Sequence, residues 1–161
     1  GYRIIEKDRP GHLNLDLLKQ YGIQPGPIYG KLKNGGSVQL ENGEMLHSHQ
    51  VVGEPKKGKI VTILGDTRPC DNVQVLAQGA DLLVHEATFL HDMKDTARKY
   101  YHSTSYQAAE AARDAGVKEL ILTHFSSRYK DEHQLEPLLE EAKTIFEPTQ
   151  LAVEHHVFPI E

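Results

Sequence analysis

The sequence predicts an α/β fold in which short buried strands alternate with helices. Apolar runs over residues 60–64, 81–84 and 119–123 have the length of buried strands, and a helix signal follows each of them. Such an alternation is typical of a layered α/β domain. The chain of 161 residues has the size of one ordinary domain, so a core of this kind can be buried within it.

The regular part of the chain begins at Lys59. The elements expected there are strand 60–64, helix 72–78, strand 81–84, helix 92–100, a helix after Thr104, strand 119–123, a helix from Pro137, and strands 151–153 and 157–158.

The ends of these helices are marked by capping residues. Asp71 is the expected N-cap of helix 72–78, and Gly79 closes that helix. Thr104-Ser105-Tyr106-Gln107 is a capping box, and Gly116 terminates the helix that it opens. The last helix opens at Pro137 and ends before Pro148.

The first third of the chain has a different character. Residues 1–6 predict a strand, whereas residues 7–57 are poor in apolar periodicity and rich in Gly, Pro and Lys. A short helix near Leu13–Tyr21 is the exception, and Gly22 ends it. We expect residues 7–57 to project from the body of the fold instead of building its core.

Two turn signals lie within this projecting segment. Residues 22–30 contain Pro25, Gly26 and Pro27 and predict a stiff, turn-rich stretch. Asn42-Gly43 predicts a hairpin between residues 37–41 and 44–46.

The net charge of −5 is unevenly distributed. Residues 1–60 contain nine Lys or Arg and six Asp or Glu, whereas residues 61–161 contain nine and seventeen. A basic first section on an acidic body favours a local contact with a polyanion. A solvated loop with a few lysines accounts for the same composition and stays open as the alternative.

Composition also limits the class of protein. No apolar run is long enough to span a membrane, so we expect no membrane contact. A single cysteine, Cys70, rules out an internal disulfide and fits a reducing compartment, which predicts a cytoplasmic protein. Nothing beside Cys70 activates it as a nucleophile, and we interpret it as a small filler before the helix.

Three polar residues of ligand type follow the buried strands. Asp66 lies in the turn after strand 60–64, His85 ends strand 81–84, and His124 follows strand 119–123. Residues at the same end of neighbouring strands can converge, and this set suits a metal centre with oxygen and imidazole ligands.

Each of these residues has a structural alternative. The two oxygens of a carboxylate can bridge two divalent cations, which suits Asp66 to a dinuclear centre. Asp66 can equally fix its own turn by accepting from the amides of Thr67 or Arg68. His124 can be a strand-end histidine whose hydrogen bonds are satisfied within the protein.

His102 is the candidate for proton transfer. It lies just before the helix opened by Thr104, whose N-terminus favours a nearby anion. A histidine there can protonate a leaving oxygen if a carboxylate orients it, and Glu86 is the candidate carboxylate. The alternative is a surface histidine in a capping loop.

Other polar residues are candidates for phosphate binding or are histidine pairs that only look like metal ligands. Arg128, Ser126 and Thr67 carry donors suited to phosphate oxygens. His47-Ser48-His49 lies in a polar loop without a nearby Asp-His pair, and His155-His156 would point to opposite faces of a strand. We expect neither histidine pair to bind metal.

Four motifs occur together in a recognisable order. They are Gly-Asp-Thr-Arg-Pro, His-Glu-Ala-Thr-Phe, His-Ser-Thr before an Ala-rich helix, and Leu-Thr-His-Phe-Ser-Ser-Arg-Tyr. With them, essentially the whole chain resembles ribonuclease Z, the tRNA 3′-end processing endonuclease family of the metallo-β-lactamase superfamily. Residues 22–27, Gly-Ile-Gln-Pro-Gly-Pro, resemble the glycine-proline motif of that family's tRNA-binding arm.

The resemblance implies an αββα sandwich with two zinc ions at the edge of its sheets. Asp66 then matches the bridging carboxylate and His124 a ligand of one zinc. His102 matches the histidine near the leaving group, with Glu86 as its partner, and His85 becomes a supporting or structural residue.

The resemblance also implies a substrate and an assembly. The substrate is precursor tRNA, which is cleaved to leave a 3′-hydroxyl on the tRNA. Residues 7–57 become the tRNA-binding arm, with contacts from Pro25, Gly26, Pro27, Lys31 and Lys33. The family pattern is a homodimer in which one subunit's arm presents tRNA to the other's active site.

One part of the family pattern is not found in these residues. It is the His-x-His-x-Asp-His motif, which supplies most zinc ligands and the general base, together with one further histidine ligand. We expect these in a companion segment or chain, so that residues 1–6 and 58–161 form the C-terminal half of the domain. The isolated chain is then expected to be inactive.

Two other functions remain as alternatives. One is a phosphodiesterase of the same superfamily that acts on small phosphodiesters or sulfate esters, and the basic arm argues against it. The other is a non-catalytic fragment for tRNA binding or dimerisation, which the absent ligands favour. Manganese or iron are alternatives to zinc.

Overall fold

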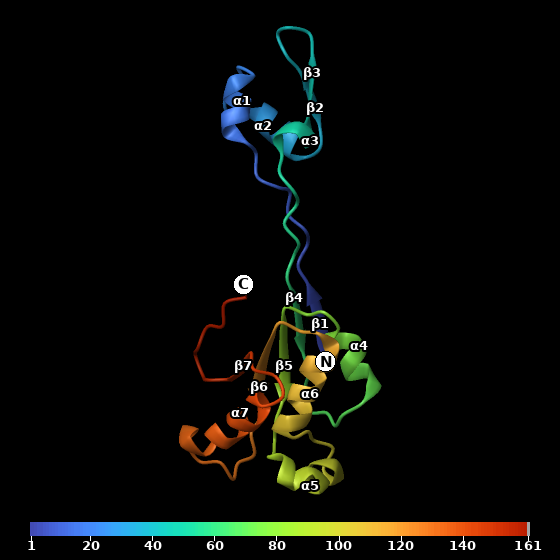
Figure 1. The fold of residues 1–161 in the computed structure, drawn as a ribbon, viewed down its shortest axis with the longest axis vertical. Helices are drawn as coiled ribbons and strands as arrows, with labels where there is room; N and C mark the ends of the chain where they lie inside the picture. Colours follow the sequence, from blue (N-terminus) through green and yellow to red (C-terminus); the bar gives the residue numbers. More distant parts are fainter. Residues whose placement is uncertain (161) are drawn as a thin grey trace. The chain divides into compact units, whose positions relative to one another are not determined.

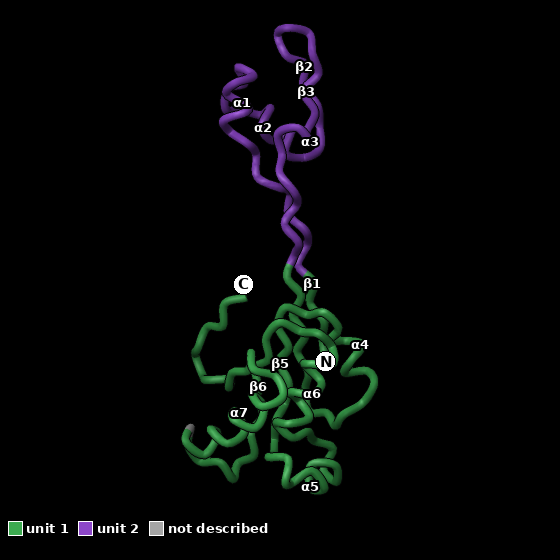
Figure 2. Tube along the Cα trace, viewed as in Figure 1, with its two compact units in different colours: residues 1–5, 59–161 green, residues 6–58 purple. Residues whose placement is uncertain are grey.

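The computed structural model describes residues 1–160 and separates into two compact units (Figure 1, Figure 2). Unit 1 holds residues 1–5 and the chain from Lys59 onward, and unit 2 holds Glu6–Gly58. Among the described residues, no helix is both long and apolar enough to cross a membrane.

Unit 1 is built on a five-stranded sheet with the order β1-β4-β5-β6-β7. Its elements are β1 (Tyr2–Ile5), β4 (Ile60–Ile63), α4 (Asp71–Ala77), β5 (Leu82–Glu86), the 3₁₀ turn η1 (His91–Met93), α5 (Lys94–Lys99), α6 (Ser105–Ala115), β6 (Glu119–Thr123), the 3₁₀ turn η2 (Glu132–Gln134), α7 (Glu136–Lys143) and β7 (Thr149–Leu151). Strands β4 to β7 are parallel, and β1 joins them as an antiparallel edge. The predicted α/β class is confirmed.

The core of unit 1 lies between this sheet and the helices α4, α6 and α7 (Figure 1). Thr62, Leu83 and Leu120 face this side, and all three are fully buried. Side chains alternate along a strand, so the residues between them face the opposite side. Short alanines on α6 allow the helix to pack closely on the sheet.

The opposite side of the sheet carries exposed apolar side chains. Tyr2 and Ile4 on β1 are 76% and 54% exposed, and Ile63 on β4 is 40% exposed. Tyr2 pairs with Ile63 across the two strands, so these side chains form one apolar stripe. A contiguous apolar stripe of this kind is typical of a surface that another layer covers.

The capping signals were correct for α6. The Thr104 side chain accepts from the Gln107 amide while the Gln107 side chain accepts from the Thr104 amide. Gly116 ends the helix in the left-handed region at φ 63°, where a glycine has no steric penalty.

Two details of the predicted elements of unit 1 were wrong. The N-cap of α4 is Cys70, not Asp71, because Asp71 already has a helical position and contributes its charge to the first turn. Residues 157–158 form no strand, and β7 is the last strand of the described chain. The remaining strands, including β5, which extends through Glu86, differ from their predicted bounds by two residues or fewer at each end.

Asp81, which precedes β5, makes hydrogen bonds to the residue that begins β4 and to the residue before β6. Its carboxylate accepts from the Lys118 ammonium at 2.6 Å and from the Ile60 amide at 2.7 Å. These two bonds, the Lys118 bond first, lower the pKa of the Asp81 carboxyl. The contribution to stability is therefore present above the unfolded-state pKa of roughly 3.9 and is lost as the pH falls through the lower folded-state value.

Asp81→Asn is expected to lower the free energy of unfolding at neutral pH by about 1–2 kcal/mol, because Lys118 is largely exposed and its bond is screened. The difference from wild type should shrink as the pH falls below roughly 4. Denaturant unfolding across pH measures this, with Asp114→Asn, which removes an exposed pair with Arg113, as the control. A constant difference at all pH values would contradict the assignment.

Unit 2 has a small core of its own. Its elements are α1 (Leu15–Gln20), α2 (Pro27–Lys33), β2 (Ser37–Gln39), β3 (Met45–His47) and α3 (Ser48–Val51). They bury Leu18, Ile23, Leu32, Leu46 and Val51. The predicted hairpin is present as β2 and β3.

The turn-rich stretch predicted over residues 22–30 is shorter than expected, because α2 begins at Pro27. Proline suits the first turn of a helix, where its missing N–H has no partner to lose. Leu32 supplies the buried side chain that holds α2 on the core of unit 2.

Candidate active site

The candidate residues of unit 1 cluster at one end of the sheet. Glu86 ends β5, Asp66 lies in the turn after β4, and His124 follows β6 directly. Because β4, β5 and β6 are parallel neighbours, their carboxyl ends meet at one edge. Ligand sites of open α/β sheets lie at this edge. His102 joins them from the segment between α5 and α6.

Asp66, His102 and His124 form a group of metal-ligand type. One potential ligand atom from each of these residues lies within 4.8 Å of the others. His124 Nε2 is 3.4 Å from Asp66 Oδ1. Two ligands of one tetrahedral zinc, with bonds of roughly 2.0–2.1 Å, lie roughly 3.3 Å apart. The spacing of Asp66 and His124 therefore fits joint coordination of a metal ion.

The backbone at this site is strained at two positions. His124 has φ 55° and Tyr101 has φ 63°, in the left-handed region that non-glycine residues rarely adopt. Such conformations cost free energy and persist mainly where the surrounding structure or function requires them. Their position beside the ligand group supports a functional interpretation of this edge.

Glu86 is a buried carboxylate at the centre of a hydrogen-bond network. It is 1% exposed. Its oxygens accept from the backbone amides of Thr67 and Ser103, at 2.7 and 3.1 Å. The Thr88 hydroxyl lies 2.6 Å from Glu86 Oε2 and His102 Nδ1 lies 2.9 Å from Oε1. These partners satisfy both oxygens and fix the carboxylate in place.

The pairing with Glu86 determines which His102 nitrogen can react. Since an ionised carboxylate only accepts, Nδ1 carries the proton that it shares with Glu86. The free nitrogen of His102 is Nε2. It can donate a proton to a leaving oxygen, or it can ligate a metal beside Asp66 and His124, and these two roles exclude each other.

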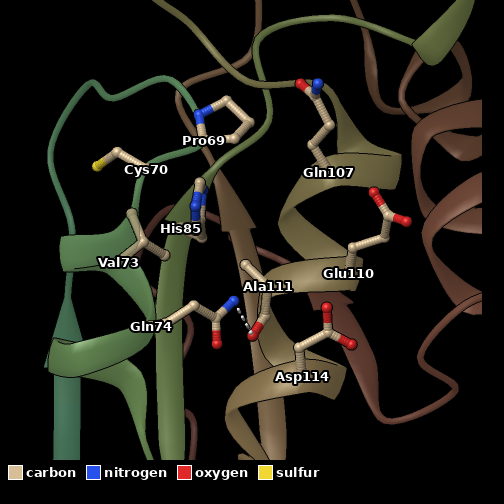
Figure 3. Close-up of a pocket in the computed structure, with 9 residues that line it drawn as sticks. All are labelled: Pro69, Cys70, Val73, Gln74, His85, Gln107, Glu110, Ala111 and Asp114. Atoms are coloured by element: carbon tan, nitrogen blue, oxygen red, sulfur yellow. Dashed lines mark hydrogen bonds between the residues drawn. The ribbon is translucent and has the colours of Figure 1, made fainter.

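His85 does not join this group, contrary to the first expectation that all three strand-end residues converge, although the resemblance implied a supporting or structural role for it. It is next to Glu86 on β5, so its side chain faces the helices. It lines a cavity of about 210 Å³ together with residues of α4 and α6. Figure 3 shows the His85 ring beside Val73. Its Nδ1 donates to the Glu86 carbonyl, and burial lowers the pKa of the His85 ring.

The donors predicted to bind phosphate differ in the hydrogen bonds that they already make within the protein. The Thr67 amide donates to Glu86, and its hydroxyl donates to the Arg68 carbonyl. Arg128 Nε donates to the Ser126 hydroxyl, and its guanidinium lies 5.0 Å from the centre of the Phe89 ring. Arg128 and Ser126 thus form one exposed donor pair near the site, whereas Thr67 acts on Glu86.

The predicted arm residues lie on the surface of unit 2. Pro25, Gly26, Pro27, Lys31 and Lys33 are all exposed. Of the histidine pairs that only look like metal ligands, His47 caps α3, bonds to Ser37 and stacks on His49, with ring centres 5.6 Å apart. Neither that pair nor His155-His156 joins a group of three possible metal ligands in residues 1–160.

Sequence reasoning missed a basic pocket beside His102. Its volume is about 680 Å³, and it is lined by Arg68, Pro69, Lys94, Asp95, Arg98, His102 and Gln107. Lys94 and Arg98 come from α5, and the His102 amide donates to the Ala97 carbonyl of the same helix, whereas Arg68 and Pro69 come from the turn after β4. The run of Lys and Arg over residues 94–99 was the available signal.

Comparisons with known proteins agree with this geometry. Residues 42–125 match the model of the β-lactamase superfamily domain. The chain is 53% identical to a ribonuclease Z of Bacillus licheniformis, over 100% of this chain and 52% of that protein. The chain thus spans about half the length of the curated relatives that it matches.

Solved structures give the same fold. The metallo-β-lactamase fold protein YhfI of Bacillus subtilis superposes with a TM-score of 0.56 at 29% identity, covering 63% of this chain and 40% of that one. The short form of human tRNase Z superposes with a TM-score of 0.50 at 30% identity, covering 73% and 37%. The expected metallo-β-lactamase fold is confirmed, and the chain belongs to the β-lactamase superfamily, with ribonuclease Z proteins as its similar relatives.

Proposed function

We propose that this chain forms part of a zinc-dependent endoribonuclease that removes the 3′ trailer from precursor tRNA. The observation that carries the proposal is the pairing of Glu86 with His102 at 2.9 Å, beside the possible metal ligands Asp66 and His124. The ribonuclease Z of Bacillus licheniformis is 53% identical over the full length of this chain, which supports the choice of substrate.

In this proposal Asp66 and His124 hold the metal. A zinc pair, when bound, lowers the pKa of water and offsets charge on phosphoryl oxygens. Water attacks the phosphorus that follows the tRNA 3′ end, the bond from phosphorus to the 3′ oxygen breaks, and His102 donates a proton to that oxygen. The products are tRNA with a 3′-hydroxyl and a trailer with a 5′-phosphate.

The protein's own donors position the phosphate. The Arg128 guanidinium, held by Ser126 and by the Phe89 ring, is exposed and can pair with phosphoryl oxygens. Thr67 acts indirectly, because its amide and the Ser103 amide fix the carboxylate that orients His102.

The site also needs ligands from residues outside this chain. A catalytic zinc has three protein ligands, so Asp66 and His124 are too few for two ions. The apolar stripe on the open side of the sheet supports a covering layer from the same source. We propose that a segment carrying a His-x-His-x-Asp-His motif supplies both.

The isolated 161-residue chain is therefore expected to show no cleavage of precursor tRNA in a single-turnover assay with added zinc. The complete protein under the same conditions should cleave it. Cleavage by the isolated chain would show that these residues suffice, whereas inactivity of both would overturn the proposed function.

Unit 2 is proposed as the tRNA-binding arm, over residues 7–57. Its excess of positive charge is small, and ion pairs engage Lys19 and Lys57. Lys31 and Lys33 have no carboxylate partner among residues 1–160 and lie in the last turn of α2, the helix that Pro27 begins. Contacts of lysine with phosphates give affinity without sequence readout, which suits an enzyme for many tRNAs.

Deleting residues 7–57 from the complete protein is expected to weaken tRNA binding at least tenfold, roughly the loss of two or three phosphate contacts, while sparing hydrolysis of a small phosphodiester. Electrophoretic mobility shift and a chromogenic diester assay measure the two effects. Equal tRNA affinity with and without the segment would contradict the assignment.

The assembly and the location follow from the same proposal. A homodimer lets the arm of one subunit hold a tRNA whose 3′ end enters the site of the other. The single cysteine, which is exposed and unpaired, fits the reducing cytoplasm.

A further inference from the structure

The basic pocket beside His102, defined above, includes neither Asp66 nor His124 in its lining. It is formed by the turn after β4, by α5 and by the first turn of α6. Its volume of about 680 Å³ lies within the range of pockets that hold one small ligand. His102 is the residue that it shares with the ligand group.

The charge of this pocket contrasts with its surroundings. Residues 61–161 contain nine Lys or Arg against seventeen Asp or Glu, yet Arg68, Lys94 and Arg98 meet here with Asp95 as the one acidic neighbour. Other cations of unit 1, such as Lys118 and Arg113, have carboxylate partners. None of the three pocket cations has an ion pair among the described residues. Arg68, Lys94 and Arg98 are exposed, and a cluster of cations without carboxylate partners is suited to an anionic ligand.

Aromatic side chains lie next to these cations. The Arg68 guanidinium lies 5.1 Å from the centre of the Tyr101 ring, and the Tyr101 residue is 64% exposed. Tyr100, its neighbour, is also exposed. Tyr101 is held at φ 63°, immediately before His102. Cations with exposed aromatic rings are the combination that binds single-stranded nucleic acid, because phosphates pair with the cations and bases stack on the rings.

We propose that this pocket binds the unpaired nucleotide whose 3′ oxygen departs. The inference rests on the proposed function. His102 lines the pocket and donates its proton to the 3′ oxygen, so the nucleotide that carries this oxygen lies on the His102 side of the phosphate. Tyr101 stacks on its base, and Arg98 and Lys94 contact the phosphates that precede it.

Binding of two tRNA ligands to the complete, metal-loaded protein tests this pocket. One tRNA ends in the unpaired 3′ nucleotide, and the other lacks it and has a blunt acceptor stem. Wild type should bind the first roughly tenfold more tightly at fixed salt, the contribution of one stacked base. Arg98→Ala and Tyr101→Gly should abolish most of this preference.

The control is Arg113→Ala, an exposed arginine on α6 outside the pocket, which should keep the preference. Tyr101→Gly should also fold normally, because glycine adopts positive φ freely. Retention of the full preference in Arg98→Ala and Tyr101→Gly would overturn the inference. The inference would also be overturned if Arg98→Ala and Tyr101→Gly weakened binding only of tRNA that carries a trailer. The pocket would then hold the trailer.

Failure of the proposed function would look different. Wild type would then fail to cleave precursor tRNA, whatever the binding preference. Cleavage by wild type with an unchanged preference in the pocket variants would refute the nucleotide pocket alone.

Discussion

Replacing His102 with alanine is expected to lower the turnover of precursor tRNA by roughly 10²- to 10⁴-fold, the range for loss of a positioned proton donor. Affinity for tRNA should change little, because the arm and the phosphate donors stay intact. Glu86 holds Nδ1 of His102 at 2.9 Å, so Nε2 is the atom whose loss is measured. Single-turnover rates and equilibrium binding, taken together, separate the two effects.

His133→Ala is the matched control, since that ring is highly exposed and pairs with Glu136 away from the site. An equal loss of turnover and affinity in His102→Ala would contradict a role in proton donation. Metal content of the same variant decides between the two roles of Nε2. A loss of bound metal would make His102 a third ligand instead of the acid.

Replacing Glu86 with alanine is expected to lower the free energy of unfolding by about 2–4 kcal/mol. The change leaves the amides of Thr67 and Ser103 buried without their acceptor. It also releases His102, so turnover should fall with stability. Denaturant unfolding of the complete protein measures the first effect, and single-turnover cleavage measures the second.

Glu86→Gln refines the interpretation because it keeps the volume of the side chain. The NH₂ group of the glutamine would face a donor from which the carboxylate oxygen accepts a hydrogen bond. Glu86→Gln should therefore also destabilise the fold. Glu140→Ala, an exposed position on α7, should stay within about 0.5 kcal/mol of wild type. If Glu86→Ala unfolds like Glu140→Ala, the carboxylate does not hold this site together.

The sequence predicted most of unit 1 because its signals are local. Thr104 and Gln107 form the capping box that their spacing indicates, and β6 has the predicted bounds. Asp66 and His124 could be assigned to one edge because each follows an apolar strand. Side chains alternate along a strand, so the adjacent positions of His85 and Glu86 already place them on opposite sides of β5.

What was missed depends on long-range packing. The positive φ values of His124 and Tyr101 have no sequence signal, since neither residue is glycine. The approach of Arg68 and Pro69 to α5 is set by tertiary structure, so the basic pocket could not be read from residues 94–99 alone. In unit 2, Pro27 and Gly26 looked like turn residues, although both are also common where a helix begins.

The most direct test of metal-dependent hydrolysis at this site is to identify the chemical ends of the products of precursor tRNA. The complete, metal-loaded protein should yield tRNA with a 3′-hydroxyl and a trailer with a 5′-phosphate, and none of either after chelation. A 2′,3′-cyclic phosphate on the tRNA, or cleavage that survives chelation, would contradict attack by water at a metal centre.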